Sequence, residues 1–393
     1  MELSSGYHII LYVLMLLLAF MVDYSYRHSK KYVTTNGVTS KRMTNTVIFF
    51  FVGLYLVYVF TEGMRYGRGV DQIGVYGPYY INPGFNRFRE YEPLFVLINS
   101  CVRAIDPLID TFPFGSIFFV YAIFFIIGLT FLYNIFKDCS KYFLVFAILA
   151  TLSFQEGFIR QALSASFIFS SIYFYLKKKW KITTLLLIAS LFIHKGNILI
   201  IAILIFCKYF FKEKTLNWKI TIPLFLLFEF VVQLDTVFDF MQYIVPFLHL
   251  SEDDQFSGYL MNTDYIELEM DTASEWRRSM MTEVLTASFY MASFYICFVL
   301  RKKYKKYSFI FNTYILCSLI FEPFRLYGTL SRAFIAGALL WFIPLSIALF
   351  EWKYNKKIIF RISILIMLAY VVTYYGRFVF FNPEARYLWD LVI

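Results

Sequence analysis

The segment PFGSIFFVYAIFFIIGLTFLYNIF, residues 113–136, contains no charged side chain. Roughly 20 mainly apolar residues are enough for a helix to cross the hydrocarbon core of a bilayer, so this segment can span a membrane. Comparable apolar runs recur along the whole chain of 393 residues, 60% of which are hydrophobic. A soluble domain of this size cannot bury so many runs, whereas helices in lipid satisfy their own backbone polar groups. The sequence therefore predicts an all-α membrane protein with one integral membrane domain, residues 1–393.

The apolar runs predict about 12 transmembrane helices, separated by short segments that hold the charged residues. Their expected ranges are 7–26, 45–63, 113–136, 142–155, 157–176, 182–193, 197–211, 219–238, 279–300, 308–324, 332–350 and 358–376. No Lys or Arg precedes the first run and no small-residue cleavage site follows it, so we expect a retained span rather than a signal peptide. Residues 91–105 are too short to span the bilayer, and one side of that segment is apolar, which predicts an amphipathic helix along the membrane surface.

The positive charges indicate the orientation. Six loops that fall on one side of the predicted bundle hold 24 of the 37 Lys and Arg residues. That side is expected to be cytoplasmic, and the same bias explains the net charge of +10 without a nucleic-acid partner. Both termini then face outward, as do two loops, residues 64–112 and the acidic residues 236–278.

Arginine and lysine are distributed unequally between the two sides. The cytoplasmic loops hold 20 Lys and 4 Arg, whereas the other 13 basic residues are 12 Arg and Lys195 alone. Topology requires positive charge inside but does not require arginine outside. The planar guanidinium makes bidentate hydrogen bonds to phosphate or carboxylate, so we expect an anionic ligand on the outer face. The alternative is that these arginines meet lipid headgroups or nearby acids.

Two short hairpins on the outer side carry candidate residues. About 12 and 15 apolar residues flank His194, fewer than a full crossing needs, so the turn is expected to lie below the outer surface in a water-filled crevice. His194 can take a proton near neutral pH, unless it is a capping or core histidine. Arg160 is expected to reach this crevice, or else to pair with Glu156 one helical turn before it.

Two further outward arginines lie later in the chain. Arg325 and Arg332 are seven residues apart, so one helix face can present both.

No metal site is predicted. The five cysteines are scattered without zinc-type spacing, and the acidic loop does not match a calcium-binding loop. A solvated outer loop, which can act as a lid, is the simpler interpretation of residues 236–278.

Three ordered motifs in residues 45–211 resemble the EpsG-type, Wzy-like bacterial polysaccharide polymerases. They are GMRYGRGVDQIGVY, REYEPLFVLIN, and FIRQALSASFIFSSIYFYLKKKWKITTLLLIASLFIHKGNILI. The resemblance implies a GT-C-like bundle in the bacterial inner membrane with its active site facing the periplasm. It implies that undecaprenyl-diphosphate-linked oligosaccharide repeat units are the substrates, and that the growing chain is transferred from its carrier to the next unit. Membrane lipids, a flippase and a chain-length regulator are the partners expected with such an enzyme, and no cofactor is expected.

We assign roles to the candidate residues on this basis. Breaking the bond between sugar and lipid diphosphate releases a charged group that guanidinium forks can stabilise. The candidates for this role are Arg65, Arg160, Arg325 and Arg332, of which the first two lie on the motifs. His194 is the candidate general base, and Asp71 or Glu92 is expected either to replace it or, preferably, to orient an arginine. Tyr66, Tyr76 and Tyr91 are candidates for stacking on sugars.

Other functions fit a similar pattern. Within the same class, the chain can be an O-antigen ligase or a single-sugar glycosyltransferase. From a different class, it can be a flippase for lipid-linked oligosaccharides, although the sequence shows none of the internal repeats common in transporters. A purely structural partner of a synthase does not need a recessed histidine and arginine.

Overall fold

The computed structural model of the chain describes residues 3–29, 32–35, 38–41, 44–66, 76–82, 91–106, 115–230, 280–322, 328–376 and 386–387. The positions of Asp71, Arg325 and the loop 236–278 lie outside the described residues. The side chains of Arg65, Tyr66 and Glu156 are outside them too. The chain divides into two units, residues 1–198 with 345–354 and 371–393, and residues 199–344 with 355–370.

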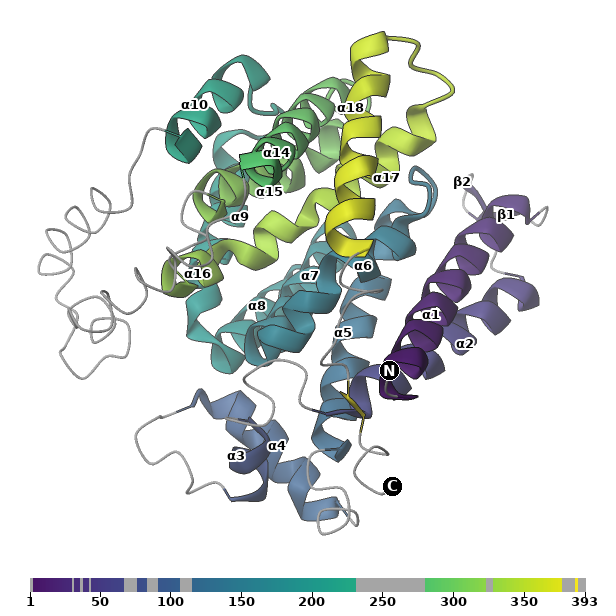
Figure 1. Cartoon of the computed structure of the whole chain (residues 1–393), viewed down its shortest axis with the longest axis vertical. Coiled ribbons are helices and arrows are strands. Elements are labelled where there is room, and N and C mark those ends of the chain that lie inside the picture. The colour runs from purple at the N-terminus through teal and green to yellow at the C-terminus, as the bar shows by residue number, and fades with distance from the viewer. Residues whose placement is uncertain are drawn as a thin grey trace, which may run out of the picture. The chain divides into compact units, whose positions relative to one another are not determined.

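The first unit consists mainly of helices (Figure 1). They are α1 (Leu3–His28), α2 (Asn45–Gly63), α3 (Gly77–Ile81), α4 (Pro93–Ile105), α5 (Gly115–Phe136), α6 (Phe143–Gly157), α7 (Ile159–Leu176) and α8 (Trp180–Ile193), with a 3-10 turn at Lys195–Asn197 and a π-helical turn at Val371–Tyr375. Two short antiparallel strand pairs accompany them. They join β1 (Tyr32–Thr35) to β2 (Val38–Lys41), and β3 (Arg65–Tyr66) to β4 (Arg386–Tyr387).

The elements described in the second unit are all helices, joined by short turns and loops. Its helices are α9 (Ile198–Phe210), α10 (Trp218–Phe230), α14 (Met280–Leu300), α15 (Ser308–Phe321), α16 (Gly328–Ala338), α17 (Phe342–Glu351) and α18 (Ile358–Tyr370), with 3-10 turns at Lys305–Tyr307 and Leu339–Trp341. The first residue of α9 and the last seven of α17 are counted with the first unit.

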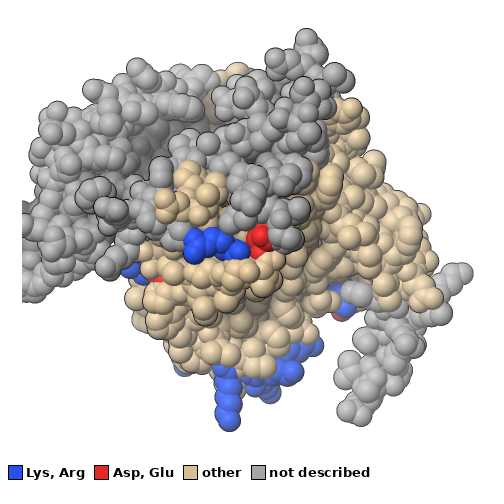
Figure 2. Space-filling view, turned by 90° about the horizontal axis from the view of Figure 1, so that it is seen from below, with Lys and Arg blue, Asp and Glu red and all other residues tan. Residues whose placement is uncertain are grey.

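The helices confirm a helical membrane protein. Six helices in the described residues are long and apolar enough to cross a membrane. They are Tyr7–His28, Asn45–Gly63, Ser116–Phe136, Met281–Leu300, Arg332–Glu351 and Ile358–Tyr375. Uncharged residues cover most of the described surface seen from below, and charged side chains appear there in a few separate places (Figure 2). The number of crossings, predicted at about 12, and the GT-C-like arrangement stay predictions.

Small residues bring α5 and α7 close together. A Cβ atom on Gly128 would lie 2.8 Å from both the Cα and the carbonyl oxygen of Ser166, so only glycine fits at this crossing. Such close backbone approach is the usual way for helices to pack in lipid, where apolar side chains gain little by leaving the membrane. The contact fixes the position of α7, whose first turn carries Arg160.

The short helix α4 is held against α5 by aromatic stacking and hydrogen bonds. Phe95 of α4 is fully buried and stacks on Tyr121, whose hydroxyl donates to Asn99 Oδ1 at 2.8 Å. At the end of α4, Asp106 accepts hydrogen bonds from the hydroxyls of Tyr80 and Ser116, at 2.8 and 2.7 Å. These contacts leave the start of α4 in a defined place, which is where Glu92 lies.

A buried carboxylate fixes the turn between α5 and α6. Asp23 of α1 is fully buried and accepts hydrogen bonds from Arg27, at 3.2 Å, and from the backbone N–H of Tyr142. Tyr142 adopts a left-handed conformation with φ of 59°, which is unusual for a residue with a side chain. The guanidinium of Arg27 also lies over the ring of Phe350, 5.3 Å from its centroid.

Candidate functional site

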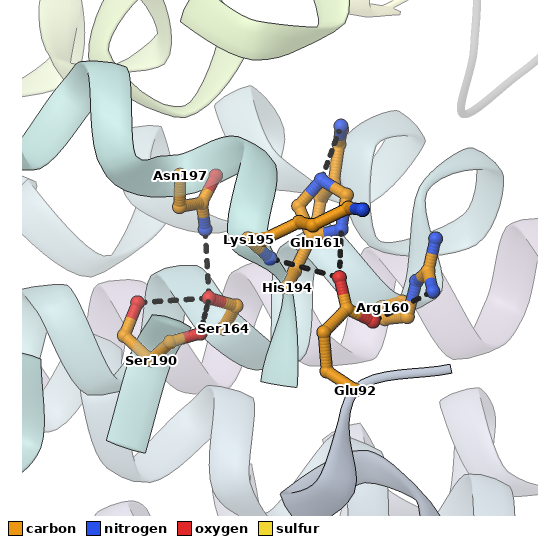
Figure 3. A network of polar contacts seen from close by, with 8 residues as sticks. All are labelled: Glu92, Arg160, Gln161, Ser164, Ser190, His194, Lys195 and Asn197. Carbon is orange, nitrogen blue, oxygen red and sulfur yellow. Dashed lines mark hydrogen bonds and ion pairs between the residues drawn. The ribbon is translucent and has the colours of Figure 1, made fainter. Parts of the chain in front are cut away.

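Glu92 precedes the first turn of α4, and its carboxylate is directed away from that helix. Its backbone is extended, with φ of −63° and ψ of 144°, and Pro93 begins the helix. Carboxylates at this position commonly cap the helix with their own oxygens, but the Glu92 side chain makes no such hydrogen bond. It contacts α7 and the turn after α8 instead, so three separate parts of the sequence meet at one carboxylate (Figure 3).

Arg160 forms an ion pair with Glu92. Its Nη1 atom lies 2.8 Å from Glu92 Oε2, and the two side chains are only 17% and 10% exposed. The guanidinium also lies over the ring of Tyr91, 4.9 Å from the centroid. Among the described residues, the buried Nε atom of Arg160 has no hydrogen-bond partner. The arginine is therefore held by a carboxylate and a ring, with further donor capacity available.

His194 ends α8 and turns its imidazole toward the same carboxylate. Its Nδ1 atom lies 3.6 Å from Glu92 Oε1, a distance that suits an ion pair but exceeds a hydrogen bond. The backbone N–H of Lys195 donates to the same oxygen at 2.8 Å. On the other side of the ring, His194 Nε2 lies 3.0 Å from the amide nitrogen of Gln161 (Figure 3). Both ring nitrogens thus face polar groups.

The two titratable groups at the site have shifted pKa values. Burial favours the neutral form of Glu92, but the nearby His194, the Arg160 guanidinium and the Lys195 N–H outweigh it and lower the pKa of Glu92 to about 2. Burial disfavours the imidazolium and lowers the pKa of His194 below its ordinary value, although Glu92 acts in the opposite direction. Near neutral pH the site therefore holds an ionised carboxylate beside a neutral imidazole.

A buried hydrogen-bond network lies under the turn that carries His194. The hydroxyl of Ser164 on α7 contacts the carbonyl and the hydroxyl of Ser190 on α8, at 2.7 and 2.8 Å. Asn197 Nδ2 donates to Ser164 Oγ at 2.8 Å, and the N–H of His194 donates to the carbonyl of Ser190 (Figure 3). All three side chains of the network are at most 1% exposed. The network connects the His194 turn directly to α7.

The structure brings together three of the residues that the motifs indicated, Glu92, Arg160 and His194. Tyr91 contacts Arg160, whereas Tyr76 is buried and packs on Tyr91 and Phe95. The described ion pair of Arg160 is with Glu92, and the Glu156 side chain expected as its alternative partner is outside the described residues.

Other predicted residues stay untested by this geometry. Arg65 and Tyr66 are described only as the backbone of β3. Arg332 is exposed in α16 of the second unit. The positions of Asp71 and Arg325 are not described.

Sequence reasoning missed Gln161, Ser164, Ser190 and Asn197. A signal was present for each. Gln161 follows Arg160 directly, and Ser164 lies one helical turn after Arg160. Ser190 is the polar residue one turn before His194, and Asn197 closes the turn that follows it. Polar residues at helical spacing from a candidate base are the ones that can hold it.

Comparison with known proteins gives one match. The model of the EpsG family matches residues 46–383. Neither the curated proteins nor the solved structures give a match. The family match covers all three residues that converge on the site, Glu92, Arg160 and His194, and extends through most of the second unit. The chain belongs to the EpsG family.

Proposed function

We propose that this protein is a membrane glycosyltransferase of the polysaccharide polymerase type. It joins undecaprenyl-diphosphate-linked oligosaccharide repeat units at the periplasmic face of the bacterial inner membrane, and lipid diphosphate is the leaving group. Membership of the EpsG family, which is associated with such polymerases, supports the reaction class. The observation that carries the site is the contact of one carboxylate, Glu92, with both Arg160 and His194.

His194 is the general base in this proposal. A group with a pKa of about 2 is a very weak base, so Glu92 is unsuited to removing a proton from a hydroxyl. Its ionised carboxylate instead faces Nδ1 and holds the ring, in the way that a third group orients the base in many enzymes. The sequence left the base open among His194, Asp71 and Glu92, and this geometry favours His194 over Glu92.

The chemical step is a displacement at the anomeric carbon of the donor sugar. The hydroxyl oxygen of the acceptor sugar forms a bond to that carbon while its proton passes to His194. The bond between the anomeric carbon and the diphosphate oxygen breaks, and its electron pair leaves with the lipid diphosphate. Arg160 lies beside the base and stabilises the charge that develops on this group. Arg65, Arg325 and Arg332 are the further candidates to hold the two diphosphates, and Tyr66, Tyr76 and Tyr91 the candidates to contact sugars.

The depth of the site follows from the length of α8. A helix rises about 1.5 Å per residue, so its 14 residues extend roughly 21 Å, less than the roughly 30 Å of the hydrocarbon core. If α8 begins at the cytoplasmic surface, as the basic residues before it indicate, then His194 lies below the periplasmic surface. A recessed site can receive a lipid-linked substrate directly from the membrane.

The test is an assay of the purified protein in detergent with the cognate undecaprenyl-diphosphate-linked repeat unit and EDTA. We expect a ladder of products spaced by one repeat unit, together with free lipid diphosphate, and no ladder from His194→Ala. His28→Gln is a matched control. His28 is the last residue of α1, and its described contacts are with the carbonyl and the ring of Tyr24, not with residues of the site. If no ladder forms with or without divalent metal, while liposomes containing the protein move the lipid across the bilayer, the protein is a transporter.

A further inference from the structure

The two ring nitrogens of His194 face different chemical groups. Nδ1 lies 3.6 Å from Glu92 Oε1, and Nε2 lies 3.0 Å from the amide nitrogen of Gln161. Among the residues that the structure describes, the charged groups around the ring are Glu92 before α4, Arg160 on α7 and Lys195 in the same turn. Of these, only Glu92 is negative, and it faces Nδ1. The proton of the neutral ring is therefore best placed on Nδ1, where it points at a carboxylate.

This assignment leaves Nε2 with its lone pair. A lone pair on Nε2 accepts a hydrogen bond, so Gln161 must present its NH₂ group to it and turn its carbonyl oxygen away. That carbonyl oxygen, Gln161 Oε1, is buried and has no hydrogen-bond partner among the described residues. An unpaired buried acceptor is energetically unfavourable, and a ligand that donates to it recovers this free energy.

Space beside Nε2 depends on Gly196. A Cβ atom at this position would lie 2.7 Å from His194 Nε2, closer than Cβ atoms approach other heavy atoms without a shift. The nitrogen that can take a proton therefore has two neighbours, an amide that donates to it and a glycine that leaves room. A small hydrogen-bond donor can therefore bind to Nε2 by displacing the Gln161 amide.

We propose that His194 Nε2 and Gln161 form the subsite for the attacking hydroxyl of the acceptor sugar, and that the Gln161 amide occupies this place in the substrate-free protein. The proposal rests on the proposed function. On binding, the hydroxyl donates to Nε2 in place of the amide, and its proton moves to Nε2 as its oxygen bonds to the anomeric carbon. Sugars carry hydroxyls on adjacent ring carbons, so a second hydroxyl of the same sugar donates to Gln161 Oε1. Gln161 is a positioning residue in this scheme, since it selects and aligns the hydroxyl but takes no proton.

The first test reads the imidazole itself. The chain contains four histidines, so ¹⁵N-histidine labelling gives few signals, and His194→Gln identifies the signal of His194. In the wild-type protein, we expect the Nδ1–H form and a pKa below 6.5. Gln161→Glu places a second carboxylate against the ring, and an opposite charge at this distance raises a histidine pKa by about 1–3 units. Gln161→Leu removes the hydrogen bond but adds no charge, so its shift is expected to be much smaller.

Two results would overturn the arrangement. One is a neutral His194 protonated on Nε2, and the other is a Gln161→Glu protein whose His194 titrates as in the wild type. Ser170→Ala is the matched control on α7, because the Ser170 hydroxyl is buried and bonds only to the Ser166 carbonyl in its own helix. Its His194 titration should equal that of the wild type, so a shift there would mean that any change in α7 perturbs the ring.

The second test measures polymerisation by the same variants. Loss of one neutral hydrogen bond corresponds to roughly a two- to tenfold change, so Gln161→Leu should raise KM for the acceptor unit by about that factor. Gln161→Glu should shift the acid limb of the rate to higher pH by the amount that the titration shows. If the wild type forms a ladder but neither variant differs from it, the subsite is wrong and the proposed function stands. If the wild type forms no ladder, the role of Gln161 toward an acceptor falls with the proposed function, even where the titration behaves as expected.

Discussion

Two carboxylates in the first unit, Asp23 and Glu92, have nearly the same surroundings. Each forms an ion pair with an arginine and accepts a hydrogen bond from a backbone N–H in a turn. Each arginine also lies over an aromatic ring, at 5.3 Å for Arg27 and 4.9 Å for Arg160. Only Glu92 faces a histidine. The part of the chain that the structure describes thus uses this arginine–carboxylate arrangement at two places, and in our proposal the imidazole gives one copy a chemical role.

The two copies also differ in how they are assembled. Asp23 and Arg27 are one turn apart on a single helix, so their pair forms wherever α1 forms. Both carboxylates accept from a distant backbone N–H, but the ion-pair partner of Glu92, Arg160, is itself 68 residues further along the chain. A pair assembled from distant segments moves when those segments move, and a substrate can therefore influence it. Substitutions at the two pairs should therefore have different effects on activity and stability.

The largest effect is expected from removing the imidazole. His194→Ala should lower the polymerisation rate by about 10²–10⁴-fold, because general-base catalysis contributes about that factor. The measurement is the initial rate of ladder formation at saturating substrate, with His28→Gln as the control. A His194→Ala protein that keeps more than a tenth of the wild-type rate would remove the chemical distinction between the two copies.

Replacing each carboxylate should distinguish Asp23, which stabilises the fold, from Glu92, which is expected to support activity. Glu92→Gln should lower the rate about 10–100-fold, the range known for groups that orient metal-bound histidines, and should also lower the stability, because the lowered pKa means that the folded state stabilises the ionised carboxylate. Asp23→Ala leaves Arg27 without its buried partner, so the free energy of unfolding should fall by about 3–5 kcal/mol. Rates and denaturation in detergent, measured on both variants, test this. Equal effects of the two substitutions on the rate would contradict the comparison.

The pH dependence should distinguish the copies further. His194 must be neutral to act, and its pKa is lowered, so the rate should fall only as the pH drops below 6.5. Glu92 raises the pKa of His194, so Glu92→Gln should move this acid limb to still lower pH. The stabilisation from Glu92 itself is complete above pH 4.5 and is lost as the pH falls toward 2. An acid limb that moves upward in Glu92→Gln would contradict the assigned orientation.

A substitution at Gly196 tests whether the position of the His194 imidazole matters for activity. Gly196→Ala should lower the rate about tenfold or more, because the added Cβ displaces His194 Nε2 and misplacement of about 1 Å costs roughly 100-fold. Gly157→Ala is the matched control, since a Cβ at that glycine meets nothing within 4 Å. Equal rates for the two variants would mean that the ring is not held where the structure places it.

The smallest effect on the rate is expected from the hydrogen-bond network of Ser164, Ser190 and Asn197, which lies next to the His194 turn. Ser164→Ala removes hydrogen bonds to Ser190 and Asn197 and leaves buried groups without partners, so the free energy of unfolding should fall by about 1–3 kcal/mol. The rate should also fall several-fold, because the His194 turn loses its link to α7. Ser171→Ala serves for comparison, as its hydroxyl bonds to a carbonyl of its own helix. A change in stability with an unchanged rate would limit the network to a role in folding.

Much of the fold was readable from the chain because apolar runs and basic loops are local signals. A helix lies in each of the predicted segments, and the short helices on both sides of His194 agree with the short hairpin expected there. The interruptions were not readable. The predicted span 332–350 is divided into α16, a 3-10 turn and α17, and α18 ends in a π-helical turn. Such changes depend on packing between helices, which no hydropathy pattern contains.

The sequence indicates three of the residues that the structure brings together, Glu92, Arg160 and His194, but not the contacts between them. Arg160 and His194 were found because a charged group within apolar helices is rare enough to be noticed. The sequence offers Glu156, one turn away, as the alternative partner of Arg160, since helical spacing is the only distance that a sequence provides. The structure pairs it with Glu92, and Gln161 was passed over because a glutamine attracts attention only when its neighbours in space are known.

The pairing of β3 with β4 sets an order in time. It joins residues 65–66 to residues 386–387, and the whole second unit lies between them in the chain. During synthesis, the chain must therefore be extended past residue 387 before the segment after α2 can form this strand pair. A chain stopped after α18 can contain Glu92, Arg160 and His194 and still lack that closure. The length of polypeptide already synthesised, and not only the presence of the site residues, decides when the β3–β4 pair can form.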